Sequence, residues 1–198
     1  MKGNEMPAKQ KITPCLWFNH NAEEALDFYF SIFGDGRILE KTYWNRGGNG
    51  PANALLSARF EFAGQEYIAL NGGPEFKFNE AVSFTVDCSS QAEIDAFSEK
   101  LTADGGWIGP CGWIKDKFGL SWQIVPSIIP EMLQDADRSK VDRVIAAVMK
   151  MHKLDIAQLE AAYRGGIGFW ADQAAIIAGQ PVRWISGIHR PTACRWPQ

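Results

Sequence analysis

The feature that most constrains the fold of this sequence is a segment pattern that occurs twice. Each copy begins with a strand-like apolar run, continues with a stretch of helical periodicity, and ends with three short β-like runs separated by turn residues. The first copy consists of 11–18, 21–34, 36–44, 54–62 and 66–71, and the second of 81–88, 90–101, 105–108, 111–115 and 119–126. The sequence therefore predicts two copies of a βαβββ module.

The two predicted helices also match each other in detail. Asn21 stands three residues before Glu24, and Ser90 stands three before Glu93, which is the spacing of a capping box. A shift of 69 residues superposes the inward-facing positions of the helices, which are Ala25 and Ile94, Phe28 and Phe97, and Ile32 and Leu101. This agreement favours a true repeat.

A repeat of this kind predicts an α+β fold in which each helix buries one face of a small sheet. The two sheets can then enclose a shared concavity, called here the cup, where a ligand would bind. After 126 the pattern becomes helical, with Asp137 and Asp155 as N-cap residues. We expect paired modules over 10–126 (10–75 and 80–126), helices over 127–163, and an appended tail over 164–198.

Composition excludes several classes of partner. A formal charge of −3 and a pI near 5.6 provide no basic field for nucleic acid or acidic lipid. The N-terminus lacks a signal-peptide pattern, and no apolar run is long enough to span a membrane, so we expect a cytoplasmic protein. The four cysteines form no CxxC pair, which indicates reduced thiols; they are Cys15, Cys88, Cys111 and Cys194.

The tail has a different composition from the rest of the chain. Residues 164–198 contain four Arg and three Trp but no Lys and no Glu. Arginine with tryptophan can bind single-stranded nucleic acid, but these residues are widely spread and interrupted by prolines. We therefore expect no nucleic-acid partner, and we expect the modules to fold without the tail.

Three blocks of the sequence resemble a known family. They are KITPCLWFNHNAEEALDFYFSIFG, ALNGGPEFKFNEAVSFTVDC and CGWIKDKFGLSWQIVP. Over about residues 10–163 the chain resembles the PhnB-like branch of the glyoxalase, bleomycin-resistance and extradiol-dioxygenase superfamily (vicinal oxygen chelate fold), whose domain often bears the label 3-demethylubiquinone-9 3-methyltransferase. The resemblance implies paired βαβββ modules and a homodimer.

In the metal-binding members of this superfamily, four strands each supply one ligand, typically His or Gln, Glu, His and Glu. Carried over by position, the ligand sites fall near Pro14 or Cys15, near Leu70 or Asn71, at Ala81 and at Gln123. None of these is a histidine or a carboxylate, and a lone glutamine is a weak neutral donor. The resemblance therefore predicts neither a metal nor another cofactor here. Cys15 remains a candidate for an exposed thiol in the cup.

Gln123 is instead interpreted as a hydrogen-bonding residue of the cup. Alternation along 119–126 puts Ser121, Gln123 and Val125 on one face, so Trp122 packs beneath the helix. Aromatic walls with a few amide or ammonium groups suit a small, flat organic ligand. The predicted ligand-binding residues are Asn71, Phe78, Trp113, Lys115 and Gln123.

The leading hypothesis is metal-independent binding of a small aromatic or hydrophobic molecule. The alternative is an enzyme on the same cup, either an isomerase or lyase or the methyltransferase of the family label. A third class is an interaction module whose cup is filled by its own side chains. Residues 166–171 match G-x-G-x-x-A but lack a preceding strand, so S-adenosylmethionine binding is unsupported. Lys115 and Asp116 are compatible with an acid–base pair or a simple turn, and no catalytic residue is assigned.

Overall fold

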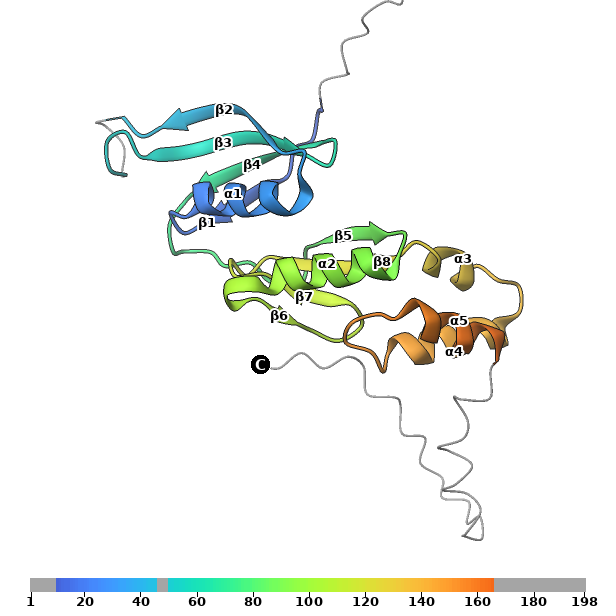
Figure 1. Ribbon diagram of the computed structural model, residues 1–198. Helices are drawn as coiled ribbons and strands as arrows, with labels where there is room; N and C mark the ends of the chain where they lie inside the picture. Colours follow the sequence, from blue (N-terminus) through green and yellow to red (C-terminus); the bar gives the residue numbers. More distant parts are fainter. Residues whose placement is uncertain (1–9, 46–49, 166–198) are drawn as a thin grey trace, which may run out of the picture. The chain divides into compact units, whose positions relative to one another are not determined.

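The computed structural model describes residues 10–45 and 50–165, and within these residues the predicted α+β class is confirmed. The chain divides into two compact units, Met1–Asn79 and Glu80–Gln198. Each unit contains a four-stranded mixed sheet with one helix against it, and the second also contains the C-terminal helices (Figure 1). Of the tail predicted over 164–198, Arg164 and Gly165 are described, and the other three Arg, the three Trp and the G-x-G-x-x-A match lie outside the described residues.

The first unit consists of β1 (Cys15–Phe18), α1 (Ala22–Phe33), β2 (Arg37–Tyr43), β3 (Leu55–Phe62) and β4 (Gln65–Asn71). Its strand order is β1-β4-β3-β2, in which β1 pairs with β4 in parallel and the other pairs are antiparallel. Phe60 and Phe62 on β3 stack on Tyr67 of β4, and Tyr29 of α1 is completely buried. This aromatic core is the reason that α1 stays on one face of the sheet.

The start of α1 differs from the prediction. The side chain of Asn21 makes no capping hydrogen bond. Instead, Oδ1 of Asn71, at the end of β4, accepts a hydrogen bond of 2.9 Å from the amide of Ala22. Nδ2 of Asn71 also donates to the carbonyl of Leu55 at 3.1 Å, so one buried side chain ties α1 to β3 and β4. The predicted end of the helix at Gly34 is correct, with φ of 81° in the left-handed region.

The second unit has the same arrangement. It consists of β5 (Ser83–Cys88), α2 (Gln91–Thr102), a short 3₁₀ turn η1 (Ala103–Gly105), β6 (Trp107–Ile108), β7 (Trp113–Lys115) and β8 (Ser121–Pro126), in the sheet order β5-β8-β7-β6. The predicted capping box is confirmed, because Ser90 Oγ accepts from the amide of Glu93. Trp122 and Ile124 are buried, and β8 contacts α2, as the alternation predicted.

A buried carboxylate holds the turn between β7 and β8. Oδ1 of Asp116 accepts from the amides of Phe118 and Leu120 at 2.9 and 3.0 Å. Its Oδ2 accepts from the indole Nε1 of Trp122 at 2.9 Å. Three donors satisfy the charge, which explains why a 3% exposed carboxylate is tolerated.

The C-terminal helices of the second unit are α3 (Ile129–Leu133), α4 (Arg138–Val148) and α5 (Ile156–Arg164). Asp137 and Asp155 cap α4 and α5 as predicted. Figure 1 shows α4 and α5 side by side, and their inner faces join the end of β8 in one apolar cluster that includes Val144, Leu154 and Leu159. Among the described residues, no helix has the length and apolar character needed to cross a membrane.

Replacing Asn71 by alanine tests its role in the first unit. The amide of Ala22 and the carbonyl of Leu55 would both lose a buried partner, and each unsatisfied group costs about 1–3 kcal/mol. We expect the free energy of unfolding in urea to fall by about 3 kcal/mol. Gln65→Ala, at an exposed position of the same strand, is the control and should change it by less than about 0.5 kcal/mol. Equal effects of the two substitutions would contradict this role.

Candidate functional site

The sheet of the second unit has one face that α2 does not cover. Cross-strand register places Trp113 and Thr85 beside Gln123, on either side of it. The next row places Ser83 and Lys115 on either side of Ser121. Because strand residues alternate between faces, these side chains lie opposite the buried Trp122 and Ile124. The structure therefore brings three of the predicted ligand-binding residues, Trp113, Lys115 and Gln123, to one sheet face.

Part of this face is the floor of an apolar groove. The groove has a volume of about 290 Å³, and α3 and α4 form its wall. Its lining residues are Cys111, Trp113, Gln123, Val125, Ile129, Leu133, Ile145, Val148, Met149 and Leu154. Leu133, Ile145 and Met149 are 37%, 46% and 43% exposed, which is high for such apolar side chains. The groove is therefore an accessible apolar surface with one amide in it.

Gln123 makes a single hydrogen bond in the part of the chain that the structure describes. Its Nε2 donates to Ser83 Oγ on β5 at 2.8 Å. This bond uses the Nε2 of the amide, and the Oε1 of this groove-lining residue is left as an acceptor. Ser121 lies two residues earlier on the same face of β8 but does not line the groove; it is completely buried, and its Oγ has no hydrogen-bond partner among the described residues. Only the strand register reveals its position beside Lys115.

Lys115 forms an ion pair with Glu80, at the start of the second unit. The hydrogen bond from Lys115 lowers the pKa of the Glu80 carboxyl below its ordinary value. Asp116 points to the other side of β7, where it bonds Trp122. Lys115 and Asp116 therefore have separate partners, and the carboxylate of Asp116 stabilises the turn between β7 and β8.

The other two predicted residues lie in the first unit. Asn71 is 5% exposed, and both ends of its amide are used in the bonds that fix α1. Phe78 is half-buried, with its ring edge-on to Phe18 at a centroid distance of 5.4 Å. Ligand contact by Asn71 or Phe78 stays a prediction. The same holds for Trp113, Lys115 and Gln123 of the second sheet.

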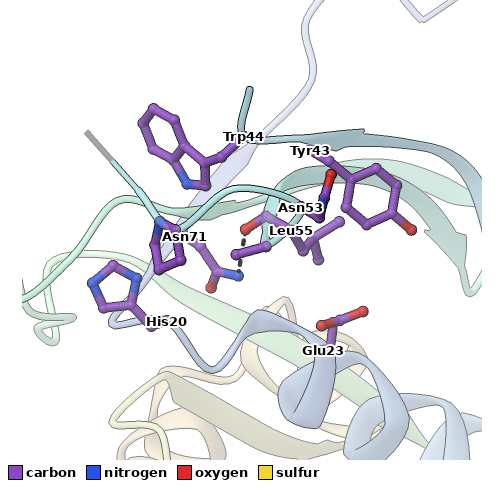
Figure 2. A pocket seen from close by; sticks show the side chains of 9 residues that line it. His20, Glu23, Tyr43, Trp44, Asn53, Leu55 and Asn71 are labelled. Carbon is purple, nitrogen blue, oxygen red and sulfur yellow. Dashed lines mark hydrogen bonds between the residues drawn. The ribbon is translucent and has the colours of Figure 1, made fainter. Parts of the chain in front are cut away.

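A second cavity, of about 370 Å³, lies in the first unit between the start of α1 and the loop that joins β2 to β3 (Figure 2). It is lined by His20, Glu23, Tyr43, Trp44, Pro51, Asn53, Ala54, Leu55 and Asn71. Except for Asn71, none of these was a sequence candidate. The pairing of β2 with β3 and the hydrogen bonds of Asn71 bring these lining residues together. No local sequence motif indicates the cavity that they form.

Metal donors are sparse in the described residues. Nowhere in residues 10–45 and 50–165 do three or more His, Cys, Asp or Glu side chains form a group that could hold a metal ion. Cys15 is exposed, but desolvation raises the pKa of its thiol, which keeps the sulfur protonated and reduces its strength as a ligand or nucleophile. Cys88 is buried, and desolvation is the main cause that raises its pKa to about 11.

A polar network fixes the helical wall of the groove. Asp135, between α3 and α4, accepts hydrogen bonds from Tyr163 Oη at the end of α5 and from Lys140 Nζ on α4. Arg143 of α4 donates to the carbonyls of Ala162 and Tyr163 at 2.8 and 2.9 Å. The bond from Tyr163 is the main cause that lowers the pKa of Asp135 to about 2.

This network predicts a specific acid response. Because the pKa of Asp135 is depressed on folding, its contribution to stability is complete above the unfolded value of about 3.8 and is lost as the pH falls toward about 2. The melting temperature of the native chain should therefore exceed that of Asp135→Asn at neutral pH, and the difference should shrink between pH 4 and pH 2. Glu131→Gln, an exposed carboxylate on α3, is the control. A difference that is independent of pH would refute the ionic role of Asp135.

Comparison with known proteins agrees with this geometry. The family model described as 3-demethylubiquinone-9 3-methyltransferase matches residues 10–125. The structure of the PhnB protein from Bacillus cereus is 34% identical, with a TM-score of 0.53, and the alignment covers 59% of this chain and 99% of that chain. No curated protein sequence gives a significant match.

Two further solved structures have lower similarity. Protein PA1353 from Pseudomonas aeruginosa is 23% identical with a TM-score of 0.47, and covers 59% of this chain and 97% of its own. The fosfomycin resistance protein FosX from Listeria monocytogenes, complexed with Mn(II) and sulfate, is 15% identical with a TM-score of 0.45, and covers 59% of this chain and 90% of its own. At TM-scores below 0.5, these two add nothing to the assignment.

Proposed function

The chain belongs to the 3-demethylubiquinone-9 3-methyltransferase family of PhnB-like proteins. From this premise we propose that it binds a small aromatic or hydrophobic molecule without a metal. The observation that carries the proposal is the cross-strand pair of Trp113 and Gln123 in the apolar groove of the second unit. One residue offers an aromatic surface and the other a directed hydrogen-bonding group.

The dimensions of the groove limit the ligand. At about 290 Å³ it lies near the lower end of the range for small-molecule sites, so it suits a molecule of one or two rings. Contact with Trp113 would bury aromatic surface, while the Oε1 of Gln123 would accept one hydrogen bond from a hydroxyl or N–H group. No lining residue of the groove carries a formal charge, which favours a neutral ligand over an ion.

The chemistry at the four positions inferred from the family supports binding without a metal. Pro14, Leu70 and Ala81 offer no donor side chain, and the thiol of Cys15 has a raised pKa. The alternative residue Asn71 is a neutral amide that is already bonded to Ala22 and Leu55. Gln123 is a neutral amide that is already hydrogen-bonded to Ser83. A divalent transition ion prefers imidazole, thiolate or carboxylate ligands, so this set favours recognition by shape and hydrogen bonding.

The family description favours methyl transfer as a second candidate function. Calorimetric titration with S-adenosylmethionine distinguishes methyl transfer from simple ligand binding. Micromolar affinity, corresponding to about −8 kcal/mol, would favour the methyltransferase. An absence of heat at millimolar concentrations of S-adenosylmethionine would favour simple binding. An isomerase or lyase on the same surface would be recognised by turnover of the bound ligand.

The binding proposal is tested with 1-naphthylamine, a two-ring aromatic probe that is neutral at pH 7 and whose fluorescence shifts to the blue in apolar sites. We expect saturable binding that is unchanged by EDTA and weakened at least about tenfold by Trp113→Ala, because the aromatic floor is lost. Trp107→Ala is the matched control, since Trp107 lies on the neighbouring strand but does not line the groove. Circular dichroism checks that both variants fold. Loss of binding in EDTA, or equal effects of the two variants, would overturn the proposal.

We also propose a homodimer, on the basis of the family and of modules that are each too small to enclose a cup. Sedimentation equilibrium should give twice the chain mass of 22.0 kDa at micromolar concentration. A species of 22.0 kDa alone under those conditions would contradict it.

A further inference from the structure

Backbone hydrogen bonds hold part of the wall of the cavity in the first unit, called here the α1 pocket. After β2 the chain continues through Trp44, whose amide donates to the carbonyl of Ala54 at 2.9 Å and whose carbonyl accepts from the amide of Asn53 at 3.0 Å. Gly50 lies directly against the indole, since a Cβ there would fall 2.4 Å from Nε1. The position of Trp44 is therefore set by the fold and needs no ligand to form it.

The strand pairing aims a second aromatic ring at the pocket. Thr42 pairs with Ser57, but the next residue, Tyr43, pairs with Leu55, so β3 has an extra residue at this point. Such a bulge increases the local twist and changes the direction of nearby side chains. As a result, the consecutive residues Tyr43 and Trp44 both line the α1 pocket, although alternation along a regular strand would separate them.

Two other lining residues are in an unusual backbone conformation. His20 and Asn53 have φ of 61° and 67°, in the left-handed region that costs a residue with a Cβ about 1 kcal/mol or more. Residues held in such conformations are concentrated at ligand sites, where the surrounding structure fixes them. Here the bonds of Asn71 to Ala22 and Leu55 hold both sides of the pocket in place.

Glu23 supplies the charge of the α1 pocket. Figure 2 shows its carboxylate rising from the first turn of α1 toward Leu55 and Tyr43. The carboxylate pairs with Lys41 at 3.3 Å, but the two side chains are 58% and 33% exposed, and exposed pairs contribute at most about 1 kcal/mol. A cation between the aromatic rings could therefore replace Lys41 as the partner of Glu23.

We propose that the α1 pocket binds a small organic ammonium ion, such as a methylated amine. The rings of Tyr43 and Trp44 attract such a cation through their negative faces, and Glu23 supplies the opposite charge. The carboxylate of Glu23 would repel an anionic ligand. A neutral molecule would gain contact with the rings but no charge interaction. His20 and Asn53 offer hydrogen bonds to a polar substituent of the ligand. This site is separate from the groove of the second unit and does not depend on it.

The experiment compares tetramethylammonium with tert-butanol, which has a similar shape and no charge. Titration of the full ¹⁵N-labelled chain is followed by NMR at the indole N–H of Trp44, which is assigned by its loss in Trp44→Phe. We expect saturable shifts with tetramethylammonium at millimolar concentration and no saturable shift with tert-butanol. Equal responses to the two compounds would overturn the proposal.

Charge substitutions make the test sharper. Glu23→Gln should weaken tetramethylammonium binding at least about fivefold, whereas Glu24→Gln, on the same turn but outside the pocket, should leave it unchanged. Lys41→Gln should strengthen binding about twofold or more, because it removes the competing cation. A structural role of Glu23 would not produce this opposite response. Unchanged affinity in both Glu23→Gln and Lys41→Gln, with the fold intact by circular dichroism, would exclude the site.

Discussion

Each unit packs one helix, α1 or α2, against one face of a four-stranded sheet, and in the second unit α3 and α4 border only part of the opposite face. The covered face carries the large apolar residues, such as Phe60 in the first unit and Trp122 in the second. The opposite face carries polar or half-buried side chains. In the first unit these include Arg59, which is paired with Glu66, and in the second they include Gln123 and Lys115. The candidate groove of the second unit lies on this opposite face, where Trp113 and Gln123 are not packed under α2.

The features that depend on local sequence were predictable. Alternation along the chain predicted β3 over 54–62, and the structure has it over Leu55–Phe62. The capping box at Ser90 and the N-caps at Asp137 and Asp155 were also predicted, because the side chain and the amide it bonds are only two or three residues apart. The placement of Trp122 under α2 followed from the two-residue period of a strand.

The features that depend on distant residues were not predictable. The capping pattern at Asn21 is the same kind of local signal as that at Ser90, yet the amide of Ala22 bonds Asn71, which is 49 residues away. The burial of Asp116 depends on the indole of Trp122 across the turn. The α1 pocket needs a bulge in β3 opposite Tyr43, and a one-residue irregularity in pairing has no signature in the alternation of apolar residues.

The groove of the second unit is lined by residues from two parts of the chain, one inside the family match and one outside it. Trp113 and Gln123 lie within residues 10–125, which match the family, whereas Leu133 and Ile145 come from helices beyond that match. The family match ends at residue 125, before α3 begins, and the alignment with the PhnB protein from Bacillus cereus covers 59% of this chain. The sheet therefore supplies the aromatic and amide groups of the groove, while α3 and α4 supply its apolar wall. Because Leu133 and Ile145 border the groove, its apolar wall comes from residues that the family model does not contain.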